Sequence, residues 1–159
     1  MITFDAMKSH FSQLLNYDCY ANLQMNNLIS QWPEIMQPVK LMAHLLSAQQ
    51  RWLSRCKFEP APATSLWPDW PANEFAQIIK SNNLDWITYL DHLQPEEFNS
   101  TITYQNTLGE NFSDQLADVL AHLVNHGTHH RAQIGQLLKL AGASLPQTDY
   151  IFYLRQLNK

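Results

Sequence analysis

The chain has 159 residues, of which 45% are hydrophobic and 15% charged, and a formal net charge of −4. This composition is too apolar for a disordered chain, and its acidic balance disfavours nucleic-acid binding. No apolar run approaches the roughly 20 residues that span a bilayer, and the first residues lack the pattern of a secretory signal. Cys19 and Cys56 are too few for a disulfide scaffold, so we expect both to pack in the interior. These observations predict a cytoplasmic protein with a single domain over residues 1–159.

Apolar residues at steps of three and four predict the first two helices. Residues 4–30 carry one apolar stripe, and Pro33 ends it because the residue before a proline disfavours helical backbone. Residues 37–57 are apolar almost all round, which indicates a helix buried on most sides. The proline-rich segment 58–73 shows no periodicity, so we expect a crossover loop there.

A third helix and a short hairpin are predicted next. Asn73 is a favourable N-cap for a helix over residues 74–93, and Pro95 follows its end. Residues 101–104 (TITY) are β-branched and alternating, and Gly109 lies in the turn-like stretch that follows. This combination predicts a β-hairpin before the last long helix.

The last long helix is predicted over residues 113–141. Ser113 is the expected N-cap, and Gly142 stands where a C-terminal glycine cap belongs. Pro146 is expected to open a short final helix. Four long helices with one crossover loop predict an all-α fold, a four-helix bundle.

Four of the seven histidines fall within nine residues of the last long helix: His122, His126, His129 and His130. On a helical wheel His130 lies roughly 40° and His126 roughly 80° from the centre of the apolar face. His122 and His129 lie roughly 120° and 140° away, so we expect them to face solvent. Two imidazoles at i, i+4 can turn toward one point, as a shared metal ion requires. Inward histidines that only pack or cap backbone groups are the alternative interpretation.

Asp18 is a second polar residue on an apolar face. It lies roughly 20° from the centre of the first helix's stripe. A carboxylate there needs a partner, and a metal-ligating imidazole often donates its other N–H to a carboxylate. We therefore expect Asp18 to support a metal site without necessarily ligating the metal, and Asp18→Leu to leave the metal-free protein more stable than Asp18→Asn. A tyrosine, a lysine or solvent is the alternative partner.

Several segments together resemble the DinB-like (DinB/YfiT) family of metalloenzymes. Residues 121–133 (AHLVNHGTHHRAQ) resemble the family signature, and residues 16–22 (NYDCYAN) resemble its first-helix pattern. Residues 43–48 (AHLLSA), followed by Trp52, are similar to its second-helix pattern. The likeness extends over nearly the whole chain and is specific as a combination.

The resemblance implies a four-helix bundle with a metal held by His44, His126 and His130. The choice of His44 follows from the resemblance alone, because its own helical wheel places it off the apolar centre. Three neutral imidazoles leave one coordination position open, which is typical of catalytic rather than structural sites. An open position can activate water or bind a thiol as its thiolate.

The resemblance also implies a function. We expect a metal-dependent enzyme of the hydrolase or thiol S-transferase type that acts on a small molecule, because characterised relatives include thiol S-transferases and a thiol-dependent isomerase. The expected cofactor is a divalent transition metal (zinc, nickel, iron or manganese), with a low-molecular-weight thiol as co-substrate. A homodimer with no nucleic-acid or membrane partner is expected. The alternatives are a non-catalytic metal-binding or stress-response bundle and a dimeric scaffold with vestigial histidines.

Overall fold

The computed structural model describes residues 3–106 and 108–158. Met1 and Ile2, which belong to the segment expected to lack a secretory signal, lie outside the described residues. Its helices are α1 (Phe4–Ile29), α2 (Met36–Cys56), α3 (Phe75–His92), α4 (Leu116–Leu140) and α5 (Tyr150–Leu157). Two short 3₁₀ helices, η1 (Ala72–Glu74) and η2 (Pro95–Asn99), flank α3. One antiparallel hairpin pairs β1 (Thr101–Gln105) with β2 (Asn111–Gln115). The all-α prediction and the hairpin are both confirmed.

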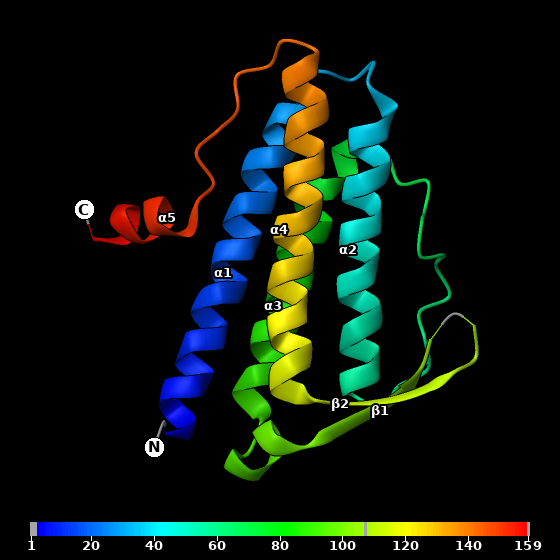
Figure 1. Ribbon diagram of the computed structural model, residues 1–159, viewed down its shortest axis with the longest axis vertical. Helices are drawn as coiled ribbons and strands as arrows, with labels where there is room; N and C mark the ends of the chain where they lie inside the picture. Colours follow the sequence, from blue (N-terminus) through cyan, green and yellow to red (C-terminus); the bar gives the residue numbers. More distant parts are fainter. Residues whose placement is uncertain (1–2, 107, 159) are drawn as a thin grey trace.

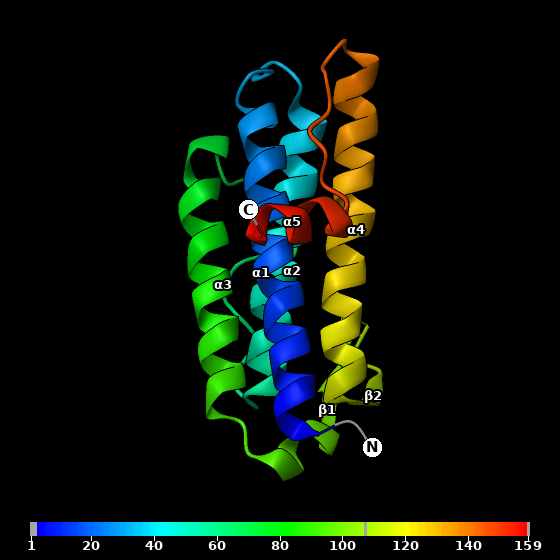
Figure 2. The same cartoon turned by 90° about the vertical axis from the view of Figure 1, so that its left-hand side faces the viewer.

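The four long helices form a bundle in which consecutive helices are not all neighbours. α1 and α2 each pack beside α3 and α4, so α1 lies diagonally from α2 (Figures 1 and 2). The crossover loop, residues 57–71, returns along α2 to the end of the bundle where α3 begins, and the hairpin lies at the opposite end (Figure 1). α5 lies across the outside of α1 (Figure 2). No helix in the described ranges is both long and apolar enough to cross a bilayer.

Local hydrogen bonds explain where α1 begins and where α4 ends. Thr3 accepts a hydrogen bond from the backbone N–H of Ala6 and caps α1. Gly142 follows α4 with a φ of +105°, a left-handed conformation that costs glycine little. The N–H of Gly142 donates to Lys139 and that of Ala143 to Leu138, which closes the helix as expected.

Three predicted boundaries are wrong, two of them because another element uses the residue. Ser113 does not cap α4, because it belongs to β2 and pairs with Thr103. Asn73 lies within η1 and makes no capping hydrogen bond to α3. Pro146 is followed by extended chain, and α5 begins only at Tyr150.

The core is divided into two apolar clusters. The cluster beside the α1–α2 turn includes Met25, Ile29, Met42, Leu45, Phe75, Ile79, Ile134 and Leu138. The cluster beside the hairpin includes Phe11, Leu15, Leu53, Trp86, Leu90, Phe98, Leu116, Leu120 and Leu123. Between them each long helix contributes buried polar side chains, which we name the polar layer: Asp18, Asn22, Gln49, Asn82 and Arg131. The histidines lie at the same level, so the bundle is polar at mid-height.

Candidate metal centre

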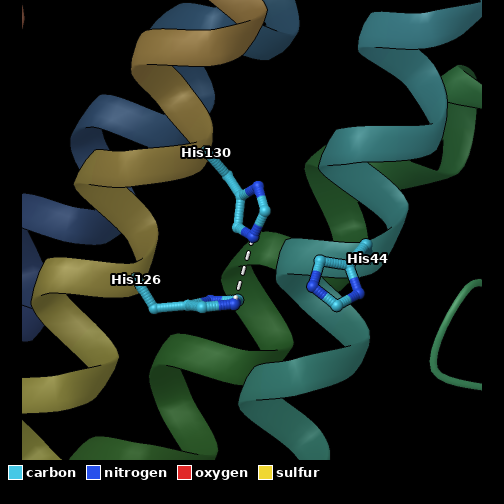
Figure 3. A group of neighbouring side chains, drawn as sticks. All are labelled: His44, His126 and His130. Atoms are coloured by element: carbon cyan, nitrogen blue, oxygen red, sulfur yellow. Dashed lines mark hydrogen bonds between the residues drawn. The ribbon is translucent and has the colours of Figure 1, made fainter.

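Three histidines from two helices meet at this level. His44 comes from α2, and His126 and His130 come from successive turns of α4 (Figure 3). One ring nitrogen from each lies within 4.8 Å of the others. Among the described residues, no cysteine, aspartate or glutamate joins this group. The structure thus brings together the three residues expected from the sequence, and their role as ligands stays a prediction.

Hydrogen bonds on the far side of two rings fix which nitrogen faces inward. Nδ1 of His130 lies 2.7 Å from Oε1 of Gln133, and Nδ1 of His44 lies 3.0 Å from the carbonyl of Leu66. Both oxygens can only accept, so Nδ1 carries the proton in each neutral ring. The Nε2 lone pairs of His44 and His130 are therefore available to a metal.

The spacing of the two α4 histidines fits a metal ion. Nε2 of His126 lies 3.1 Å from Nε2 of His130. Two imidazole nitrogens about 2.0–2.1 Å from zinc, at the tetrahedral angle, lie about 3.3–3.4 Å apart. The present rotamers therefore need little change to share one ion, and the donor set suits zinc, nickel or iron.

Burial keeps the three imidazoles neutral. Burial, and then the neighbouring His130 and His44, lower the pKa of His126 to about 3. Burial also lowers the pKa of His130 against the opposing effect of Gln133, and that of His44 against the opposing effect of Leu66. Neutral imidazole is the form that binds a metal, so all three are in the ligand form at pH 7.

Aromatic side chains lie on two sides of the histidine group. Trp67 of the crossover loop stacks on His44 with a centroid distance of 3.9 Å and an interplanar angle of 12°. One edge of Trp67 stays open, since half of the residue is exposed. On the hairpin side Trp52 contacts His122, and His122 in turn contacts His126. The histidine group is therefore bordered by the ring of Trp67 on one side and by those of Trp52 and His122 on the other.

His122 and His129 are exposed, as the helical wheel predicts. Cys19 and Cys56 are free thiols outside the histidine group. Cys56 is buried, and its burial raises the pKa of the thiol to about 12, which leaves it protonated and unreactive.

Asp18 is buried as expected, but its partner is not an imidazole. It pairs with Arg131 in an ion pair in which both side chains are almost fully buried. Asn22 and Gln49 donate to its other oxygen at 2.8 and 2.7 Å. Any support that Asp18 gives to the metal centre therefore passes through Arg131, which directly follows His130 in α4.

Two residues that matter here were not anticipated from the sequence. Arg131 lies about 60° from the apolar centre of its helix, on the other side of that centre from His126 and His130, and this angle places it inward. Gln133 follows His130 at i+3, where a side chain reaches the same face. Both signals were present in the spacing, whereas nothing in the loop sequence indicated that Trp67 covers His44.

Comparison with known proteins identifies the family. The sequence profile of the DinB family matches residues 29–158, which include all three histidines. The chain belongs to the DinB family. It is 38% identical over 61 residues to "Protein DinB" of Bacillus subtilis (strain 168), a stretch that spans 38% of this chain and 36% of that DinB protein. No solved structure gives a significant match.

Proposed function

We propose that this DinB-family chain is a metal-dependent enzyme of the hydrolase or thiol S-transferase type that acts on a small molecule. The observation that carries the proposal is the group of three neutral histidines, which no carboxylate or thiol from the described part of the chain joins. His44, His126 and His130 would hold one divalent transition metal: zinc, nickel, iron or manganese. Such an ion leaves a position at which water or a low-molecular-weight thiol becomes nucleophilic.

The surrounding residues prepare the histidines for this role. Gln133 and the carbonyl of Leu66 hold the rings of His130 and His44 in the required tautomer. Trp67 covers one face of His44 and limits access of water from that side. A small substrate would approach on the side of His126, the one residue of the three that is only half-buried.

Metal content tests the ligand assignment. Elemental analysis of purified wild type should give one metal ion per chain, and His44→Ala, His126→Ala and His130→Ala should each lose most of it. His129→Gln is the matched control, because its exposed ring adjoins His130 without joining the group. Wild-type metal content in both α4 variants, His126→Ala and His130→Ala, would show that the site is wrong.

Turnover separates an enzyme from a metal-binding bundle. The metal-loaded protein should accelerate loss of a small thiol in the presence of monobromobimane, or hydrolysis of a simple ester or amide. The metal-free protein and the His130→Ala variant should not. Full metal content without either activity would favour the non-catalytic alternative, a metal-binding or stress-response bundle.

We also propose that the chain forms a homodimer. Apolar side chains remain exposed near its carboxyl end, where Leu140, Leu145, Ile151 and Leu157 lie on and after α4. Light scattering at micromolar concentration should give twice the chain mass of 18.4 kDa. A single species at the mass of one chain would contradict this.

A further inference from the structure

Two arginines continue the face of α2 that carries His44. Arg51 and Arg55 follow His44 by seven and eleven residues, which returns each to within about 20° of the same face. They lie about 10 and 16 Å from His44 along the helix axis. Both are only partly exposed, and they account for two of the few basic side chains of an acidic protein.

These arginines border a pocket of their own. A cavity of about 350 Å³ lies between α2, the start of the crossover loop and β1. Glu59 contributes the one carboxylate that lines it, and the other polar lining residues are Arg51, Ser54, Arg55, Thr103, Tyr104 and Gln105. The pocket is distinct from the metal centre, because none of the three histidines lines it.

The two guanidinium groups share their pocket with one carboxylate, that of Glu59, but do not pair with it. Neither makes an ion pair within the described residues, where the only pairs join Lys8 to Asp91 and Arg131 to Asp18. Like charges at i, i+4 on a helix are destabilising, so the bundle gains nothing from this pair alone. In addition, Nε of Arg51 is buried and has no hydrogen-bond partner among the described residues. An unpaired buried donor is rare in a folded protein, and a bound ion or polar ligand is one explanation for it.

Each arginine is nevertheless held in place. Arg51 donates to the carbonyl of Thr64 at 3.1 Å, and Arg55 donates to that of Gln105 at 3.1 Å. The guanidinium of Arg55 also lies 4.4 Å from the ring centroids of Trp52 and Tyr104. One N–H of each group is used in these bonds, and the others remain for a ligand.

We propose that this pocket binds a dianionic group, a phosphate or a pair of carboxylates. The planar guanidinium matches both chemistries through paired N–H donors, and two such groups balance two negative charges. Ser54 and Tyr104 line the same pocket, although the Ser54 hydroxyl already donates to the carbonyl of Gln50 at 3.2 Å and that of Tyr104 to Asp114 at 2.7 Å. The proposal does not depend on the metal, because a small anion is too short to reach His44 from here.

Thermal unfolding and calorimetric titration of the protein without added metal test the site. Inorganic phosphate and succinate are the probes, with sodium chloride at matched ionic strength as the control for screening. Near saturation one of them should raise the Tm of wild type by several degrees, since a ligand that binds only the folded state stabilises it. Arg51→Gln and Arg55→Gln should each weaken binding about tenfold or more. Arg155→Gln on α5, away from the pocket, should bind as wild type does.

Further variants distinguish a ligand-binding role of Arg51 and Arg55 from a purely structural one. If the two arginines bind the anion, Arg51→Lys and Arg55→Lys should retain part of the affinity. The double variant Arg51→Gln/Arg55→Gln should keep its Tm in the absence of anion but lose the rise in Tm that the anion causes. Preference for phosphate indicates a phosphate ester as the ligand, and preference for succinate indicates a dicarboxylate. An anion response no larger than that of sodium chloride, or one that persists in the double variant, would overturn the proposal.

Discussion

Gly127 of α4 lies directly against the carboxylate of Asp18 on α1. A Cβ atom at position 127 would overlap Oδ1 of Asp18 and would lie 2.8 Å from Nη1 of Arg131. Glycine therefore lets α1 and α4 approach closely at the level where the polar layer crosses the bundle. Because His126 directly precedes this contact, the same approach fixes the height and rotation of the metal-binding face of α4.

We predict that Gly127→Ala destabilises the protein by about 1–3 kcal/mol, the usual cost of overpacking a core. The sign is informative, because alanine in place of glycine inside a helix ordinarily stabilises by about 1 kcal/mol. Gly135→Ala is the matched control on the same helix, since its Cβ would meet only ordinary contacts, the nearest at 3.5 Å from Leu145. Chemical denaturation of the two variants should give changes of opposite sign, and equal stabilisation by both would contradict this packing.

The ion pair between Asp18 and Arg131 reverses one expectation drawn from the sequence. An apolar residue at position 18 would leave the buried guanidinium without a counter-charge, at a cost of about 3–5 kcal/mol. We therefore predict that Asp18→Leu is less stable than Asp18→Asn, whose amide oxygen still accepts from Arg131. This outcome is measured as the free energy of unfolding of the metal-free proteins.

The double variant Asp18→Leu/Arg131→Met supplies the control for that prediction. It removes both charges and should recover most of the stability lost in Asp18→Leu. If the double variant is as unstable as Asp18→Leu, the loss arises from packing at position 18 rather than from the stranded charge. We still expect Asp18→Asn to weaken metal binding measurably, through the position of Arg131 beside His130.

Gln133 should tune metal affinity without contacting the metal. Its side-chain oxygen accepts from Nδ1 of His130 at 2.7 Å, so Gln133→Leu frees the ring to rotate and to change tautomer. Loss of such a partner typically weakens metal affinity about 10–100-fold. Metal titration with a competing chelator measures the change, and Gln136→Leu, an exposed glutamine on the same helix, should match wild type. Equal affinity in Gln133→Leu would show that the ring is held by other contacts.

The sequence was sufficient for features that repeat along a helix. The periodic apolar stripes predicted the four long helices, and the same wheel separated inward His126 and His130 from exposed His122 and His129. Helix starts were less predictable, because Ser113 is a good cap whose strand pairing with Thr103 prevails. The hairpin itself was predicted from residues 101–104 and Gly109, but the residue at which its second strand ends and α4 begins depends on the pairing with β1, which the residue type at position 113 does not reveal.

Contacts between residues on different helices or loops were the second feature that the sequence did not predict. The position of Asp18 on an apolar face predicted that its carboxylate needs a partner. Whether that partner is an imidazole or Arg131 depends on how α1 packs against α4. The stacking of Trp67 on His44 depends on the path of an aperiodic loop. Neither can be derived from the spacing within one helix.

The three histidines of the candidate metal centre should make the metal-free protein sensitive to acid. In the unfolded chain His126 takes up a proton near its ordinary pKa of 6.5, whereas in the folded protein burial lowers that pKa to about 3. Between these values the unfolded state binds more protons, so the free energy of unfolding decreases as the pH falls. This contribution is fully present above about pH 6.5 and is lost toward pH 3. His130 and His44, whose pKa values are also lowered by burial, act in the same direction.

We therefore predict that the Tm of the metal-free wild type falls between pH 7 and pH 5, and that His126→Gln shows a shallower fall. His129→Gln, which changes an exposed neighbour, should keep the wild-type slope. Scanning calorimetry at constant ionic strength measures all three proteins. The fall should be only partly removed in His126→Gln, because two other histidines still gain protons on unfolding. A slope in His126→Gln as steep as in wild type would mean that His126 is not held neutral by the fold.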